Sequence, residues 1–335
     1  MRYNSKDILK VVLPLLLAAA ILWWMYRGFK WDEMWTVLQT DMSWTWMLLS
    51  FPFGISAQVF RALRWRQALA PLGDRPRLST CIHAVFLSYF SSLIVPRVGE
   101  ILRCGVLNRY EGTNLSHSVG TVVTERVVDM SMVLLFSLIT VLTQIPVFMR
   151  FFRSTGVSMS GFLQTFSASG YLVTGLCLVL ILLLIVFLLH RLNLFSHTKG
   201  ALNGLMEGLL SVRHLKSPVL FLVNTVGIWL SYYLHFYVTF YCFSFTENLG
   251  AVAALVAFVV GCFAVLVPTP NGAGPWHFAV KTVLVLYGVN AVSGALFALV
   301  VHTTQTLLIV VLGLYALLAL AFTKRRNPIA SSANE

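Results

Sequence analysis

The sequence predicts an all-α polytopic membrane protein. Of its 335 residues, 58% are apolar and 11% are charged, whereas a soluble domain carries about 25% charged residues. The apolar residues form long runs, several of which approach or exceed the roughly 20 residues that a membrane-spanning helix needs. These runs lack the alternating pattern of a transmembrane β-barrel. A soluble all-α protein with a large core is the alternative, but such a protein does not need apolar runs of this length.

The formal net charge of +12 fits this class. The basic residues lie at the ends of apolar runs, as in cytoplasmic loops, where anionic lipid headgroups are their natural partners. They are not interleaved with exposed aromatic residues, so we expect no nucleic-acid binding. The five cysteines are odd in number and include no C-x-x-C pair, so we expect no disulfide framework, no metal and no cofactor.

The first predicted span covers residues 8–26. Basic residues precede it and place the N-terminus in the cytoplasm: Arg2, Lys6 and Lys10. The apolar run continues past the small residues 18–20, so we expect an uncleaved helix and not a signal peptide. The acidic stretch 27–41 is expected outside, with Trp31 and Trp35 suited to an interfacial helix.

The second predicted span covers residues 44–60. A strongly basic stretch follows it at residues 61–66, and Arg75 and Arg77 lie beyond. We expect these basic residues to form a cytoplasmic loop.

Two further apolar segments end in helix-breaking residues. Residues 84–95 run into Pro96 and Gly99, and the run is too short to cross a bilayer. The second segment, 251–267, runs into residues 268–275, which contain three prolines and two glycines and cannot form a continuous helix.

The positive-inside rule decides how these two segments are interpreted. If residues 78–95 crossed the membrane fully, the basic loop 190–216 would lie outside and break the rule. A re-entrant turn after residue 95 keeps that loop in the cytoplasm. A second turn at residues 268–275 likewise allows the last span to deliver the basic residues 324–326 to the cytoplasm.

The predicted topology therefore has six full spans and two re-entrant hairpins. The full spans are 8–26, 44–60, 119–147, 170–190, 218–244 and 292–322, and the hairpins are 79–110 and 251–289. The hinge residues are Pro96, Gly99, Pro268, Pro270, Gly272 and Gly274. Interrupted short segments in the two halves are the best pointer to a transport site that a sequence offers.

Two alternatives stay open on the residues alone. In the first alternative, each half-segment crosses the membrane as a tilted full span. This gives ten helices and makes the basic loop 190–216 an exception to the positive-inside rule. In the second alternative, the two halves form an inverted structural repeat, because the two breaks occupy equivalent positions in them. No repeat is visible in the sequence itself. In either case we expect one membrane domain, residues 1–326, and a short cytoplasmic tail, residues 327–335.

Charged residues gather around the first break and at the start of the next span: Arg97, Glu100, Arg103, Arg109, Glu125, Arg126 and Asp129. A charge at membrane depth costs about 2.5–3.5 kcal/mol on insertion scales, so such groups are paired, hydrated or used. One interpretation is that the arginines bind the phosphate of a lipid headgroup, while the carboxylates orient them or meet a headgroup amine. The other is a set of salt bridges that holds the hairpin to the bundle.

The second break offers fewer polar groups. Asn271 and His277 are the polar side chains with hydrogen-bonding reach, and a helix N-terminus near His277 is suited to an anionic group. The alternative for His277 is an interior histidine that is hydrogen-bonded within the protein.

A catalytic function is the main competing hypothesis. Glycosyltransferases that use polyprenyl-phosphate sugars keep acidic residues in a first external loop, where this chain has Asp32 and Glu33. A lipid-modifying enzyme using these residues, or Glu125 and Asp129, is thus an alternative. The chain has no serine-hydrolase, zinc-protease, P-loop or dinucleotide motif, so we assign no catalytic residue and expect transport to be passive or driven by a gradient.

Several motifs resemble one family. Residues 96–103 read P-x-x-G-E-x-x-R, and residues 125–129 read E-R-x-x-D. With Arg64 and Trp65 upstream and the break at 268–274, this order resembles the lysylphosphatidylglycerol synthase transmembrane-region family. The resemblance is specific in the first half. It is looser in the second, where the family often has Pro-Gly-Gly followed by an acidic residue.

The resemblance implies a lipid translocase. In relatives this region precedes a soluble aminoacyltransferase domain and is held to flip the aminoacylated lipid to the outer leaflet. Because this chain ends at Glu335, we expect the translocating part alone, with a separate enzyme synthesising the lipid. Stand-alone relatives are linked to glycolipid and polyprenyl-linked intermediates, so lysyl-phosphatidylglycerol itself is not assumed. The expected substrate is a lipid with a phosphate-containing headgroup, an aminoacylated phospholipid or a glycolipid.

The expected location is the bacterial inner membrane, with both termini in the cytoplasm. A homo-oligomer is compatible with the sequence. A third hypothesis, a membrane subunit that transports nothing, predicts that every buried charge tolerates substitution.

Overall fold

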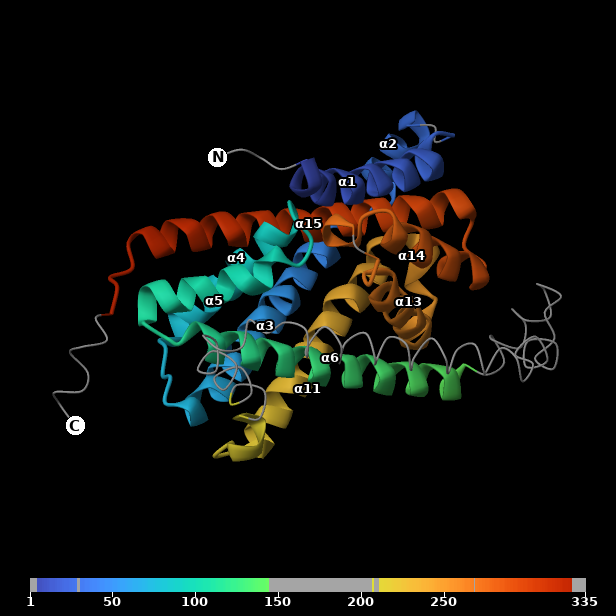
Figure 1. Ribbon diagram of the computed structural model, residues 1–335. Helices are drawn as coiled ribbons and strands as arrows, with labels where there is room; N and C mark the ends of the chain where they lie inside the picture. Colours follow the sequence, from blue (N-terminus) through green and yellow to red (C-terminus); the bar gives the residue numbers. More distant parts are fainter. Residues whose placement is uncertain (1–4, 29–30, 145–206, 208–210, 268, 327–335) are drawn as a thin grey trace, which may run out of the picture. The chain divides into compact units, whose positions relative to one another are not determined.

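The computed structural model describes residues 5–28, 31–144, 207, 211–267 and 269–326. All regular secondary structure in these ranges is helical (Figure 1), which confirms the predicted all-α class. The predicted span 170–190, the hinge Pro268 and the tail 327–335 lie outside the described residues. The chain divides into two compact units, Met1–Thr140 with Gly204–Glu335, and Val141–Asn203. The description below concerns the first unit.

One order of long and short helices occurs twice. The first half contains α1 (Ser5–Tyr26), α2 (Trp31–Thr40), α3 (Trp44–Leu69), η1 (Ala70–Leu72), α4 (Leu78–Ser92), α5 (Val98–Glu111) and α6 (Leu115–Thr143). The second contains η3 (Ser211–His214), α11 (Pro218–Tyr237), η4 (Val238–Cys242), α12 (Ser244–Glu247), α13 (Gly250–Ala264), η5 (Pro270–Gly272), α14 (Pro275–Leu286) and α15 (Ala291–Ala321). In each half, a pair of helices of 12 to 15 residues lies between two longer ones: α4 and α5 between α3 and α6, and α13 and α14 between α11 and α15.

Within the described ranges, three helices are long and apolar enough to cross a membrane: Leu115–Thr143, Pro218–Cys242 and Ala291–Ala321. Each coincides with a predicted span. Their outer surfaces carry exposed large apolar side chains such as Leu134, Leu222 and Leu318, which is the pattern of helices that face lipid. The chain is therefore a multi-pass membrane protein.

The second predicted span ends too early. Instead of stopping at residue 60, α3 continues to Leu69, because the basic stretch consists of good helix formers. Arg61 and Arg64 consequently lie inside a helix and are 4% and 0% exposed. The prediction that residues 61–66 form a loop is wrong, since they are helical and two of their arginines are buried against acidic side chains. The side of the membrane on which they lie stays a prediction.

The first break separates α4 from α5 as predicted. Pro96 lies in the gap, and Arg97 takes the left-handed conformation, with φ 65°, immediately before α5. Gly99 lets the two helices pack closely, since a Cβ there would be 1.9 Å from the carbonyl oxygen of Ser88. At 15 and 14 residues, the helices are about 22 Å and 21 Å long, shorter than the roughly 30 Å hydrocarbon core.

The second break has the same character. Between α13 and α14 the backbone takes positive φ at Asn271, Gly272 and Gly274. Asn271 and Arg97 are the two non-glycine residues with positive φ in the described chain, one in each break. Gly274 lies against α1, because a Cβ there would be 3.0 Å from the Cβ of Ile21. The depth of either helix pair in the membrane stays a prediction.

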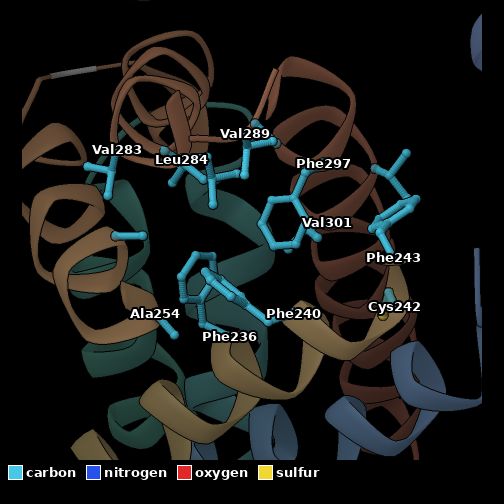
Figure 2. Packing of buried hydrophobic residues seen from close by; sticks show 14 of the residues in the cluster. Phe236, Phe240, Cys242, Phe243, Ala254, Val283, Leu284, Val289, Phe297 and Val301 are labelled. Carbon is cyan, nitrogen blue, oxygen red and sulfur yellow. The ribbon is translucent and has the colours of Figure 1, made fainter. Parts of the chain in front are cut away.

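Two apolar clusters hold these helices together. One joins η4, α13, α14 and the first half of α15 around Phe240 and Phe297, whose rings are 5.2 Å apart (Figure 2). The other joins the second half of α3 to α4, α5 and the end of α15 around Trp65 and Leu107. Helix α15 enters both clusters, and so does α3, through Met47 in the first and Trp65 in the second. Between membrane helices such packing stabilises through van der Waals contact.

The C-terminal end of α15 is tied to the first helix pair. The backbone N–H of Arg326 donates to the Tyr110 carbonyl at 2.8 Å, and Arg77 donates to the Lys324 carbonyl at 2.8 Å. Arg77 also pairs with the buried carboxylate of Glu111 at 2.7 Å. These bonds fix the end of α5, and α5 carries Arg103.

Candidate functional site

The site lies where three helices contribute charged side chains. Glu125 and Asp129 on α6 are four residues apart and therefore share a helix face. That face meets Arg61 and Arg64 from α3 and Arg103 from α5. All five side chains are less than 10% exposed.

Each carboxylate is held by two or more guanidinium groups. Glu125 accepts from Arg103 Nη2 at 2.6 Å and from Arg64 Nε at 3.4 Å. Asp129 accepts from Arg64 Nη2 and from Arg61 Nη1, both at 2.7 Å. Arg126 Nη2 adds a third bond to Asp129 at 2.9 Å. All four carboxylate oxygens are therefore occupied by arginine N–H donors.

Arg103 is the least satisfied member of the site. Its Nε and Nη1 atoms are buried and have no hydrogen-bond partner among the described residues. The guanidinium lies over the ring of Trp65, 4.5 Å from its centroid, a cation–π contact that holds the group flat. The Trp65 ring is itself fixed, because its Nε1 donates to Thr121 Oγ1 at 3.0 Å.

The surplus of donors extends beyond Arg103. Arg61 Nε and Arg126 Nε are also buried without a partner, and Gln58 Oε1 is an unpaired acceptor on the same helix as Arg61. In contrast, Arg64 uses all three of its nitrogens, the last one to Thr225 Oγ1 at 3.4 Å. An unsatisfied buried donor costs about 1–3 kcal/mol, so these positions favour an oxyanion that accepts from them.

Arg126 and Glu100 form the rim of the site. They are 3.5 Å apart, and their side chains are 43% and 34% exposed. This pair is longer and more solvated than the buried ones, so it contributes little to stability. It is the part of the charge network that opens at the lowest cost.

The structure brings together five of the residues predicted around the first break: Glu100, Arg103, Glu125, Arg126 and Asp129. It places the other two apart from them. Arg97 and Arg109 are exposed and make no ion pair with any described residue. Glu111, buried at the other end of α5, belongs to the Arg77 contact.

Sequence reasoning missed Arg61 and Arg64 as site residues. They were assigned to a loop because they follow an apolar run. Their spacing was a usable signal. Residues three apart, such as Arg61 and Arg64, and residues four apart, such as Glu125 and Asp129, lie on one face of a helix, so the two pairs can meet.

The polar residues of the second break are engaged within the protein. His277 Nδ1 accepts the N–H of Gly274 at 3.2 Å, so the histidine caps the start of α14. Asn271 Nδ2 donates to Thr306 Oγ1 at 2.9 Å, and the backbone carbonyl of Asn271 accepts from His302 Nε2 at 3.0 Å. Among the described residues no hydrogen bond or ion pair joins Asn271 or His277 to the charged site. This arrangement favours the interior-histidine alternative for His277.

His302 was not predicted from the sequence. It lies within the apolar run of α15, and its ring centroid is 4.4 Å from that of His277. A single histidine in an apolar run was the available signal. In the described part of the chain, no three His, Cys, Asp or Glu side chains come together as metal ligands would.

Comparison with known proteins identifies the family. The family described as lysylphosphatidylglycerol synthase TM region matches residues 11–313. The chain belongs to this family. The match covers α3, α5 and α6, which supply the charged site of this member of the lysylphosphatidylglycerol synthase TM region family. No curated protein and no solved structure matches the chain.

Family membership supports a membrane function related to lipids. It confirms the resemblance seen in the sequence motifs. Family membership does not identify the substrate or the activity, which depend on the residues of the charged site.

Proposed function

We propose that this protein translocates a lipid with a phosphate-containing headgroup across the membrane, while the acyl chains stay in the bilayer. The observation that carries the proposal is Arg103, a buried arginine with two unpartnered guanidinium nitrogens. Membership of a lipid-related membrane family supports a lipid as the source of the missing acceptor.

The chemistry follows from the donor set. A guanidinium presents its N–H groups in a planar fork that matches two oxygens of a phosphate group. In Arg103, Nη2 is held by Glu125 while Nε and Nη1 are free. Because Nη2 is part of both bidentate edges of the guanidinium, Nε and Nη1 point in different directions, and each donates singly to a phosphate oxygen. Arg61 Nε is a further unpaired donor in the same network. Glu125 and Asp129 keep the arginines in place.

Access to the buried arginines passes the rim. The headgroup enters as the contact between Arg126 and Glu100 opens, and Arg126 retains its bond to Asp129. Arg103 lies five residues after the start of α5, about 8 Å along the helix axis. If the α4–α5 pair is re-entrant, as proposed from the topology, Arg103 lies within the hydrocarbon region.

The proposal treats the protein as a transporter without a catalytic step. The enzymatic alternative at this site needs Glu125 or Asp129 free to act as a base or a nucleophile, but the four oxygens of these carboxylates already accept arginine N–H groups. Asp32 is an exposed residue of α2, and among the described residues it belongs to no group of three or more acidic, histidine or cysteine side chains. We further propose the bacterial inner membrane and cytoplasmic termini, on the positive-inside argument.

The test uses purified protein in lipid vesicles. Movement of a lipid with a fluorescent acyl chain is followed by quenching of the outer leaflet. Arg103→Gln is expected to slow movement at least tenfold, whereas Arg66→Gln, which removes one exposed positive charge from α3, leaves it unchanged. Equal rates in wild type and a folded Arg103→Gln protein would overturn the proposal.

The same vesicles test the enzymatic alternative. Mass spectrometry of the lipids before and after incubation is expected to show unchanged masses. A new lipid mass formed by wild-type protein and absent in Asp32→Ala would favour an enzyme.

A further inference from the structure

We infer that the headgroup is a phosphodiester with one negative charge and no free amine. This inference rests on the proposed function, because it takes the charged site as the place where the headgroup binds. It departs from the aminoacylated headgroup that the sequence led us to expect, and it selects a headgroup without an amine.

The first argument is the charge of the buried site. Three arginines and two carboxylates are buried there, which leaves a net charge of +1: Arg61, Arg64, Arg103, Glu125 and Asp129. The rim pair of Arg126 and Glu100 adds one charge of each sign and leaves the total unchanged. An unbalanced buried charge is costly, and a single negative charge on the headgroup makes the whole neutral.

The second argument is the inventory of hydrogen-bonding atoms. The unpaired buried atoms are four donors against one acceptor, Gln58 Oε1 on the same helix as Arg61; the donors are Nε and Nη1 of Arg103, Nε of Arg61 and Nε of Arg126. The oxygens of both buried carboxylates are already bonded to arginines. The site thus has several donors for phosphate oxygens and no free carboxylate oxygen for an ammonium group.

Glu100 is the remaining acidic group near the site. Its side chain is 34% exposed, so it keeps part of its hydration, and its charge is balanced by Arg126. An ammonium group gains little from such a solvated partner. Glu100 therefore does not provide the buried amine site that an aminoacylated headgroup needs.

Four headgroup classes are distinguished by these arguments. A phosphatidylglycerol-type headgroup, with one negative charge, neutralises the buried site. A zwitterionic headgroup, as in phosphatidylethanolamine, leaves the +1 charge in place and adds an unpaired ammonium. Lysyl-phosphatidylglycerol, with a net positive headgroup, raises the total to +2. A phosphomonoester carries about −1.5 to −2 at pH 7 and overshoots neutrality.

The experiment compares these four lipids with wild-type protein. Movement of each is measured in otherwise identical vesicles, and binding of each is measured by native mass spectrometry in detergent. We expect phosphatidylglycerol to move and to bind at least tenfold better than the other three. Equal movement of all four, or a preference for lysyl-phosphatidylglycerol, overturns the inference but leaves lipid translocation intact.

The two readouts separate the inference from the proposed function. If no lipid moves faster than in protein-free vesicles, translocation is refuted, and binding alone then decides the headgroup class. Tenfold tighter binding of phosphatidylglycerol supports the inference in that case. Equal binding of the four lipids overturns it.

A charge-shifted variant tests the cause of the preference. Arg61→Gln lowers the buried charge from +1 to 0, while Asp129 keeps its bonds to Arg64 and Arg126. The preference for phosphatidylglycerol over phosphatidylethanolamine is expected to fall from at least tenfold to about twofold. Arg66→Gln removes an exposed charge and is expected to keep the full preference. An unchanged preference in Arg61→Gln overturns the charge argument, and if that variant does not fold, the wild-type panel still decides.

Discussion

Replacing Gly99 with alanine tests how the first helix pair positions the site. The new Cβ would lie 1.9 Å from the Ser88 carbonyl oxygen and 2.6 Å from Ser92 Oγ. A carbon and a carbonyl oxygen normally stay about 3.3 Å apart, so the shortfall is about 1.4 Å against a backbone atom that cannot rotate away. The two helices have to separate, or one has to slide along the other.

The size of the effect follows from two opposing contributions. Overpacking of this kind costs about 1–3 kcal/mol, and the contact with a backbone atom puts Gly99→Ala near the upper value. Alanine regains about 1 kcal/mol of helix propensity. We therefore expect a net loss of about 2 kcal/mol in the free energy of unfolding. Since Arg103 follows one turn later on α5, we also expect slower lipid movement.

Gly105 provides a matched control on the same helix. A Cβ at Gly105 meets nothing within 4 Å, so Gly105→Ala is expected to stabilise the protein by about 1 kcal/mol through helix propensity. Both variants are compared by thermal unfolding in detergent, followed by a thiol-reactive dye that reports exposure of the buried Cys81 and Cys104. The close packing of α4 and α5 is refuted if the two variants shift the transition in the same direction by the same amount.

Three further substitutions test separate parts of the account. Asp129→Asn removes the partner of two buried arginines and is expected to cost about 3–5 kcal/mol in denaturant unfolding; a loss below 1 kcal/mol would mean that water screens the site. His277→Ala removes the cap on the Gly274 N–H and is expected to cost about 1 kcal/mol, with His277→Asn restoring most of it; equal stability of the two variants would argue against capping. Arg97→Gly relieves a positive φ and is expected to raise stability by up to about 1 kcal/mol relative to Arg97→Ala, which removes the same charge; no difference between them would contradict the left-handed backbone at this position.

The sequence predicted the helical class and the places where helices break, for physical reasons that are local. Pro96, followed by Gly99, and the group of prolines and glycines after residue 267 disfavour a continuous helix, and both breaks appear where expected. A single proline is not enough, since Pro52 lies inside α3. Long apolar runs likewise identified α6, α11 and α15.

The extent of α3 and the composition of the site were harder to predict. A run of arginines after an apolar segment usually marks a membrane boundary, and nothing local distinguishes an arginine in water from one paired with a distant carboxylate. Arg64 reaches Glu125 and Asp129 across about sixty residues of sequence. The partners of Asn271 were hidden for the same reason, since His302 and Thr306 lie on α15, further along the chain.

The most direct test of the central claim is the distance between Arg103 and a lipid phosphorus atom. Solid-state NMR on protein with ¹⁵N-labelled arginine in phosphatidylglycerol bilayers measures dipolar coupling between guanidinium nitrogens and ³¹P. A coupling at hydrogen-bonding range that disappears in Arg103→Gln and persists in Arg66→Gln is the predicted result. A coupling that is unchanged when Arg103 is replaced would contradict the assignment of Arg103 as the phosphate receptor.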